Sequence, residues 1–102
     1  MKVKHKLKRD EVSYLIHVLH DVVPESNNEL IIVSVIKKIR LSLLKKLLTD
    51  SKSFKLELDD TQAVAFNLFI DNYALNYNSY TENLIRTIYN ANDQFLTNFK
   101  LS

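Results

Sequence analysis

Residues 54–58, Phe-Lys-Leu-Glu-Leu, alternate apolar and charged side chains, and residues 3–7, Val-Lys-His-Lys-Leu, alternate in the same way 51 positions earlier. Alternation with a period of two places every second side chain on one face of an extended strand. Each segment therefore predicts a short strand. The match between them also suggests an internal repeat with a shift of 51 residues.

Each predicted strand leads directly into an amphipathic helix. The first helix is expected from about Arg9 to Val22, because its apolar residues have the spacing of one helical face: Val12, Leu15, Ile16, Leu19 and Val23. The second follows Asp59, a good N-cap residue with Gln62 three positions later, whereas Lys8 is a poor cap for the first. After the shift, the apolar positions 12, 15, 19, 22 and 23 correspond to Ala63, Phe66, Ile70, Tyr73 and Ala74.

A second helix is expected in each half, and a Ser-x-x-Glu capping box marks each start. The boxes are Ser26–Glu29 and Ser79–Glu82. The first of these helices should run from Asn27 to Leu48 or Asp50 as a central core helix, because more than half of its circumference is apolar. The other should run from about Tyr80 to Phe99 as a peripheral amphipathic helix.

These elements predict a mostly α fold of the α+β class, in the order β-α-α-β-α-α. We interpret it as one domain, residues 1–102, built as a tandem pseudo-repeat with halves at about 3–50 and 54–99. The two strands are expected to pair as a small antiparallel ribbon over four helices. Such a ribbon has two edges, which must be covered by helices or extended by strands of another chain.

The composition excludes several classes of site. The chain has 102 residues, 46% hydrophobic and 25% charged, with no Cys and no Gly. Without Cys there are no disulfides or thiolate metal sites, and without Gly there is no P-loop, dinucleotide-binding fingerprint or nucleophile elbow. His17, His20 and Asp21 share a helix face, with His5 elsewhere, but they lack the spacing of a metal motif. We expect a non-enzymatic protein with no cofactor and no metal site.

The sequence contains no stretch that predicts a membrane helix or a secretory signal. The longest run in the basic half without a charged residue or histidine, Leu30 to Ile36, has seven residues, far short of the ~20 that span a bilayer. We therefore expect a cytoplasmic protein, intracellular or virion-associated. A phage, mobile-element or accessory protein would have this size and composition.

Basic residues suggest one possible function, nucleic-acid binding by a regulator. Residues 1–51 carry ten Lys or Arg against six Asp or Glu, and the candidate contacts lie on the first strand and the long helix. These candidates are Lys2, Lys4, Lys6, Lys8, Arg9, Lys38, Lys45 and Lys46. Lysines on an edge strand also prevent aggregation, and a basic stripe is also the ordinary solvated face of a buried helix.

Apolar residues suggest the preferred function, which is protein binding or assembly. The helix after Asp59 is apolar on more sides than one core contact requires, so it either lies centrally or presents a surface to another chain. The candidate interface residues are Phe69, Val64, Leu68, Leu75 and Tyr77. We expect a small module that self-associates, as a homo-oligomer, or docks on a larger protein assembly.

Overall fold

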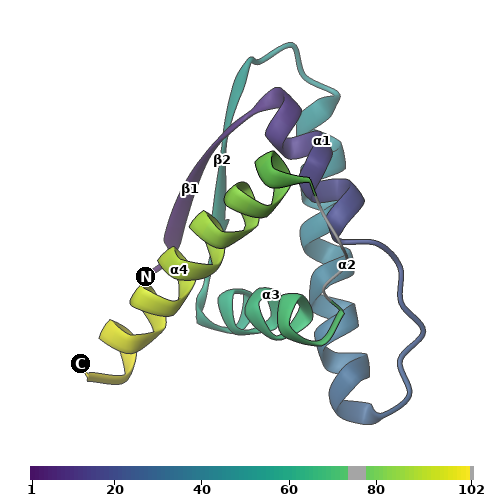
Figure 1. Cartoon of the computed structure of the whole chain (residues 1–102), viewed down its shortest axis with the longest axis vertical. Coiled ribbons are helices and arrows are strands. Elements are labelled where there is room, and N and C mark those ends of the chain that lie inside the picture. The colour runs from purple at the N-terminus through teal and green to yellow at the C-terminus, as the bar shows by residue number, and fades with distance from the viewer. Residues whose placement is uncertain (74–77, 102) are drawn as a thin grey trace.

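The computed structural model describes residues 1–73 and 78–101. Its elements follow the predicted order (Figure 1). They are β1 (Val3–Lys8), α1 (Arg9–Val18), α2 (Asn27–Leu47), β2 (Ser53–Leu58), α3 (Asp60–Tyr73) and α4 (Ser79–Leu101). The mostly helical α+β fold with two strands is therefore confirmed for the described residues.

The two strands form an antiparallel ribbon, as predicted. Lys4 lies opposite Glu57 and Leu7 opposite Phe54, so the alternation gives the ribbon one charged face and one buried face. His5 is paired with Leu56, 51 residues later, as a local twofold axis through the ribbon would require. The helices are less alike, because α1 has 10 residues and α3 has 14. The tandem duplication therefore remains a prediction.

The first helix is shorter than predicted and ends at Val18 instead of Val22. The ring Nδ1 of His20 lies 3.0 Å from the carbonyl oxygen of Val18, where it donates to a group that a longer helix would have bonded internally. Val23, expected on the buried face, is 85% exposed in the connection to α2.

Two of the expected helix starts are capped largely as predicted. The Asp59 carboxylate accepts from the backbone N–H of Gln62 at 2.8 Å, and the Gln62 side chain accepts from the N–H of Asp59 at 3.0 Å. The Ser26 hydroxyl accepts from the N–H of Glu29 at 3.2 Å, but the Glu29 carboxylate accepts from the N–H of Glu25 at 2.7 Å. Both arrangements satisfy donors that a helix start leaves without a partner.

The predicted capping box at Ser79–Glu82 is wrong. The cap is Asn78, whose side-chain oxygen accepts from the N–H of Thr81 at 2.8 Å. Asn is as good a cap as Ser, so the helix begins one residue earlier than the box predicted.

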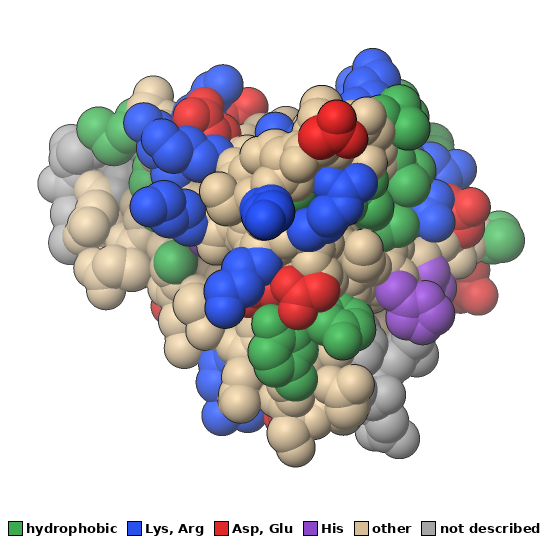
Figure 2. Space-filling model, turned by 90° about the horizontal axis from the view of Figure 1, so that it is seen from above, with side chains coloured by type: hydrophobic (Ala, Val, Ile, Leu, Met, Phe, Trp, Pro, Cys, Tyr) green, Lys and Arg blue, Asp and Glu red, His purple; other side chains and the backbone are tan. Residues whose placement is uncertain are grey.

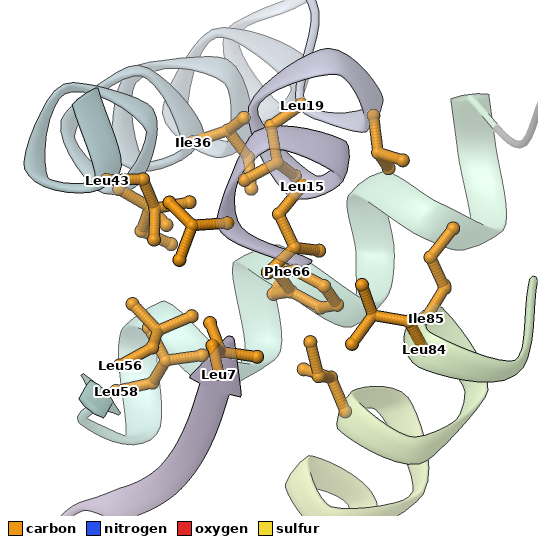
Figure 3. Packing of buried hydrophobic residues seen from close by; sticks show 14 of the residues in the cluster. Leu7, Leu15, Leu19, Ile36, Leu43, Leu56, Leu58, Phe66, Leu84 and Ile85 are labelled. Atoms are coloured by element: carbon orange, nitrogen blue, oxygen red, sulfur yellow. The ribbon is translucent and has the colours of Figure 1, made fainter. Parts of the chain in front are cut away.

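The core lies where the ribbon and the four helices meet. Phe66 of α3 lies in the middle of the cluster, and side chains from the ribbon, α1, α2 and α4 converge on it (Figure 3). The α2 helix buries Val33, Ile36, Ile39 and Leu43, which confirms it as a core helix. The α3 helix contacts both α2 and α4, so it is buried along two sides and leaves only one narrow strip exposed.

Candidate protein-binding groove between α2 and α3

An apolar groove of about 250 Å³ lies between α2 and α3. The α2 side is aliphatic, and the α3 side adds apolar side chains with an acidic group and a hydroxyl at the start of the helix. The lining residues are Ile31, Ile32, Val35, Asp60, Thr61, Val64, Ala65 and Leu68. A groove with this lining offers shape and apolar contact to another protein, and few polar groups for a small polar ligand.

Two side chains at the groove remain well exposed on α3, and a third projects beside it from α2. Val64 and Leu68 are each 40% exposed, and Ile31 is 62% exposed. The wheel positions explain this, because Val64 and Leu68 lie on the exposed strip of α3, whereas Ala65 and Phe69 lie on its buried side. Ile31 is thus the most exposed of these three apolar side chains at the groove.

A hydrogen bond joins the two helices that form the groove. The Tyr73 hydroxyl, at the end of α3, donates to the carboxylate of Glu29, in the first turn of α2, at 2.9 Å. The backbone N–H of Glu25 and the Tyr73 hydroxyl both stabilise the charged carboxylate and lower the pKa of Glu29. The hydrogen bond to Glu29 also raises the pKa of Tyr73. This contact ties the start of α2 to the end of α3.

The structure supports only part of the predicted interface set. Val64 and Leu68 line the groove. Phe69 is not a surface residue: it is 1% exposed, with ring centroids 5.8 Å from His20 and 5.1 Å from Tyr73. The prediction assumed a single buried stripe on this helix, but α3 has neighbours on two sides. Leu75 and Tyr77 lie outside the described residues.

Ile31 and Val35 were not among the predicted interface residues, although their helix gave a usable signal. The predicted apolar arc of α2 covered more than half of its circumference, and one core contact cannot bury such an arc. The exposed apolar residues on the other flank have the same origin: Leu41, Leu44 and Leu48 are 52%, 38% and 87% exposed.

The predicted basic residues lie on two elements, the β1 end of the chain and α2. Lys4, Lys6 and Lys8 point to the exposed face of the ribbon, where Lys55 of β2, which was not predicted, joins them. On α2, Lys46 lines a second groove with Lys55 and Glu57. Figure 2 shows Lys and Arg side chains gathered on the face seen from above, with acidic groups among them.

The remaining predicted lysines line neither groove. Lys38 and Lys45 are exposed on α2, and Lys2 precedes β1. Among the described residues, the only ion pair within 4.0 Å joins Arg86 to Glu82, so these lysines are not neutralised by a carboxylate in this way.

Arg9 is exposed, but its guanidinium has a structural role. Its guanidinium donates to the carbonyl oxygens of Leu47, Thr49 and Ser51 and lies 6.0 Å from the centre of the Phe54 ring. These carbonyls belong to the end of α2 and the connection that follows, so Arg9 caps α2. Its donors are thus already engaged within the chain.

A buried chain of polar side chains links β1, α4 and α3. His5 Nε2 lies 2.8 Å from Asn92 Oδ1, Asn92 Nδ2 donates to Asn67 Oδ1 at 3.1 Å, and Asn67 Nδ2 donates to the Tyr89 carbonyl at 3.2 Å. A carbonyl oxygen can only accept, so the Tyr89 end fixes both amide orientations. His5 Nε2 must then carry a hydrogen and donate to Asn92.

This arrangement predicts a pH-dependent contribution to stability. Burial lowers the pKa of His5 below the ordinary 6.5, and the bond to Asn92 opposes this only in part. The unfolded chain therefore binds the proton more readily, so the folded state should lose stability as the pH falls through 6.5 towards the folded pKa.

Urea unfolding of the wild type and His5→Gln between about pH 8 and about pH 5 tests this prediction. The free energy of unfolding of the wild type should fall relative to that of His5→Gln over this range. The variant His17→Gln, on the exposed side of α1, is the control for removing an imidazole. Its free energy of unfolding should fall relative to that of His5→Gln, as it does in the wild type. Parallel profiles for the wild type and His5→Gln would contradict the prediction.

The described residues contain no group of three or more His, Cys, Asp or Glu side chains arranged to hold a metal ion. No helix in the described ranges combines the length and hydrophobicity needed to cross a bilayer. No protein-family model, curated protein or solved structure matches the chain.

Proposed function

We propose that this protein is a self-associating binding module that uses the groove between α2 and α3. The observation that carries the proposal is the apolar groove itself, in which Val64 and Leu68 remain 40% exposed. Exposed apolar surface of this kind marks protein–protein contacts when it is contiguous and partly concave.

A second copy of the chain is a suitable occupant because the surface can complement itself. Ile31, Val64 and Leu68 all line the groove and are all exposed. Across a twofold axis, Ile31 of each copy would pack against Val64 and Leu68 of the other, as in an isologous dimer. The contact would bury side chains that the single chain leaves in water, and each buried aliphatic side chain contributes up to about 1.5–3 kcal/mol.

Nucleic-acid binding has weaker support. Arg9 is engaged by three carbonyl groups of its own chain, and Glu57 lies opposite Lys4 within the ribbon. The lysines of β1 and of α2 also lie on separate elements, and the strand between them contributes Glu57 as well as Lys55. Protein binding is therefore the function that we propose.

Analytical ultracentrifugation of the wild type and Leu68→Lys tests the proposal. The wild type should form dimers at micromolar concentration, and Leu68→Lys should weaken the dimer at least about 30-fold, because a charge would enter the centre of the contact. The matched control is Val23→Lys, which also replaces an exposed aliphatic residue by lysine, but in the connection between α1 and α2. Circular dichroism should show that both variants keep the fold.

Two results would contradict self-association through this groove. One is a wild-type protein that stays monomeric up to about millimolar concentration. The other is a dimer that Leu68→Lys and Val23→Lys weaken equally.

A further inference from the structure

The outer edge of β1 presents backbone groups that the described part of the chain does not pair. The N–H of Arg9 donates to the carbonyl of Lys52, which continues the strand register as a hydrogen-bonded pair. Hydrogen-bonded and non-hydrogen-bonded pairs alternate along an antiparallel ribbon, so the backbone groups of Lys4, Lys6 and Lys8 point away from β2. The N–H of Lys8 confirms this direction, because it donates to the Glu11 carboxylate at 2.8 Å.

Beside this edge lies a groove of about 500 Å³ between β1 and α4. Its β1 side includes Lys4, His5, Lys6 and Leu7. Its α4 side has an apolar part, Leu84, Ile88 and Ala91, and a polar part, Tyr80, Asn83 and Thr87, with Glu11 of α1 at one end. Figure 1 shows α4 running beside the ribbon and passing close to the lower end of β1.

We propose that an acidic extended peptide of another protein binds in this groove as a third strand beside β1. The outward N–H and C=O groups of Lys4 and Lys6 would supply main-chain hydrogen bonds, as in other cases of strand addition. A strand added at the usual spacing of about 4.8 Å would lie over α4 as β1 does.

The lysines determine the chemistry of this partner. A second copy pairing its own β1 antiparallel to this edge would bring lysines directly opposite lysines, which is destabilising. A strand with glutamate or aspartate at alternate positions would instead place an acid opposite Lys4 and another opposite Lys6. Its intervening apolar side chains would point towards Leu84, Ile88 and Ala91.

The other edge of the ribbon is a poorer site for the same peptide. The groove beside β2 is smaller, about 350 Å³, and is lined by Ser42, Lys46, Lys55, Leu56 and Glu57. It has one apolar lining residue, Leu56, so it offers the intervening apolar side chains of an added strand much less contact than Leu84, Ile88 and Ala91 do. We therefore assign the peptide to the β1 edge.

Fluorescence anisotropy with the full chain and a labelled peptide, Ser-Val-Glu-Val-Glu-Val-Ser, tests the proposal. The peptide should bind saturably. Replacing both glutamates by lysine, or methylating both glutamate nitrogens, should each weaken binding roughly ten-fold or more, because the first inverts the charge match and the second removes the edge hydrogen bonds.

Two protein variants separate the groove from a general charge effect. Lys4→Glu combined with Lys6→Glu should reverse the preference, so that the lysine peptide binds more tightly than the glutamate peptide. Thr87→Trp should obstruct the groove and weaken binding roughly ten-fold or more. Its control is Thr97→Trp, on the same helix outside the groove, since both hydroxyls bond the carbonyl four residues earlier at 2.9 Å.

Equal affinity for the acidic and basic peptides, or no binding at about millimolar peptide, would overturn the proposal. The proposal would also be overturned if random double-stranded DNA displaced the peptide from the β1 lysines and if Thr87→Trp left the affinity for that DNA unchanged. Leu68→Lys should leave peptide binding intact, so failure of the dimer and failure of this site are distinguishable.

Discussion

Replacing Asn92 by leucine is expected to lower the free energy of unfolding by about 2–6 kcal/mol. Asn92 is fully buried and joins His5 to Asn67. Leucine fills a similar volume but leaves the His5 Nε2–H and the Asn67 Oδ1 without partners. Each orphaned buried group costs about 1–3 kcal/mol, and urea unfolding monitored by circular dichroism measures the total.

The control for this substitution is Asn90→Leu, at an exposed position of the same helix. It makes the same chemical change outside the polar chain, so its effect should stay within about 0.5 kcal/mol. Replacing His5, Asn67 and Asn92 together by leucine should recover much of the loss, because removing all partners leaves few orphaned groups among these side chains. A single Asn92→Leu variant as stable as the wild type would show that the polar chain does not stabilise the fold.

Replacing Phe69 by alanine is expected to destabilise the protein by about 3–5 kcal/mol. Phe69 is 1% exposed and contacts His20 and Tyr73, so its removal leaves a cavity where the end of α3 meets the connection between α1 and α2. For a chain of this size, each kcal/mol lowers the unfolding temperature by about 4–8 °C, which differential scanning calorimetry resolves.

The neighbouring residue supplies the control. Leu68 is 40% exposed, so Leu68→Ala should cost about 1 kcal/mol or less. The two positions should therefore affect different properties. Phe69→Ala should lower the stability of the fold, and changes at Leu68 should weaken association. Similar thermal stabilities for Phe69→Ala and Leu68→Ala would place Phe69 outside the core.

The parts of the fold that local pattern determines were predictable. Alternation in 3–7 and 54–58 identified both strands, and the apolar spacing after them identified the helices. The helix ends were less predictable, because Val18 and Asn78 mark boundaries through hydrogen bonds that compete closely with the expected caps. The sequence pattern does not rank such near-equal alternatives.

The sites were harder to predict, since they depend on contacts between distant elements. A periodic stripe identifies one buried face, so Phe69, which faces a second neighbour of α3, was assigned to the surface. The Asn67–Asn92 contact joins two polar residues on different helices, and polar residues on a helix usually indicate its solvated side. Val64 and Leu68 were recovered because their strip lies outside both buried sides of α3.

The pairing of β1 with β2 also constrains how the chain acquires its structure during synthesis. Residues 3–8 cannot form their ribbon until residues 53–58 are available, and His5 reaches Asn92 only after another 34 residues have followed. An early-emerging segment must therefore wait for residues more than 80 positions later, because contacts so far apart in sequence form late. We expect a fragment that ends before β2 to expose the apolar faces of α1 and α2 and to be digested by protease more readily than the full chain.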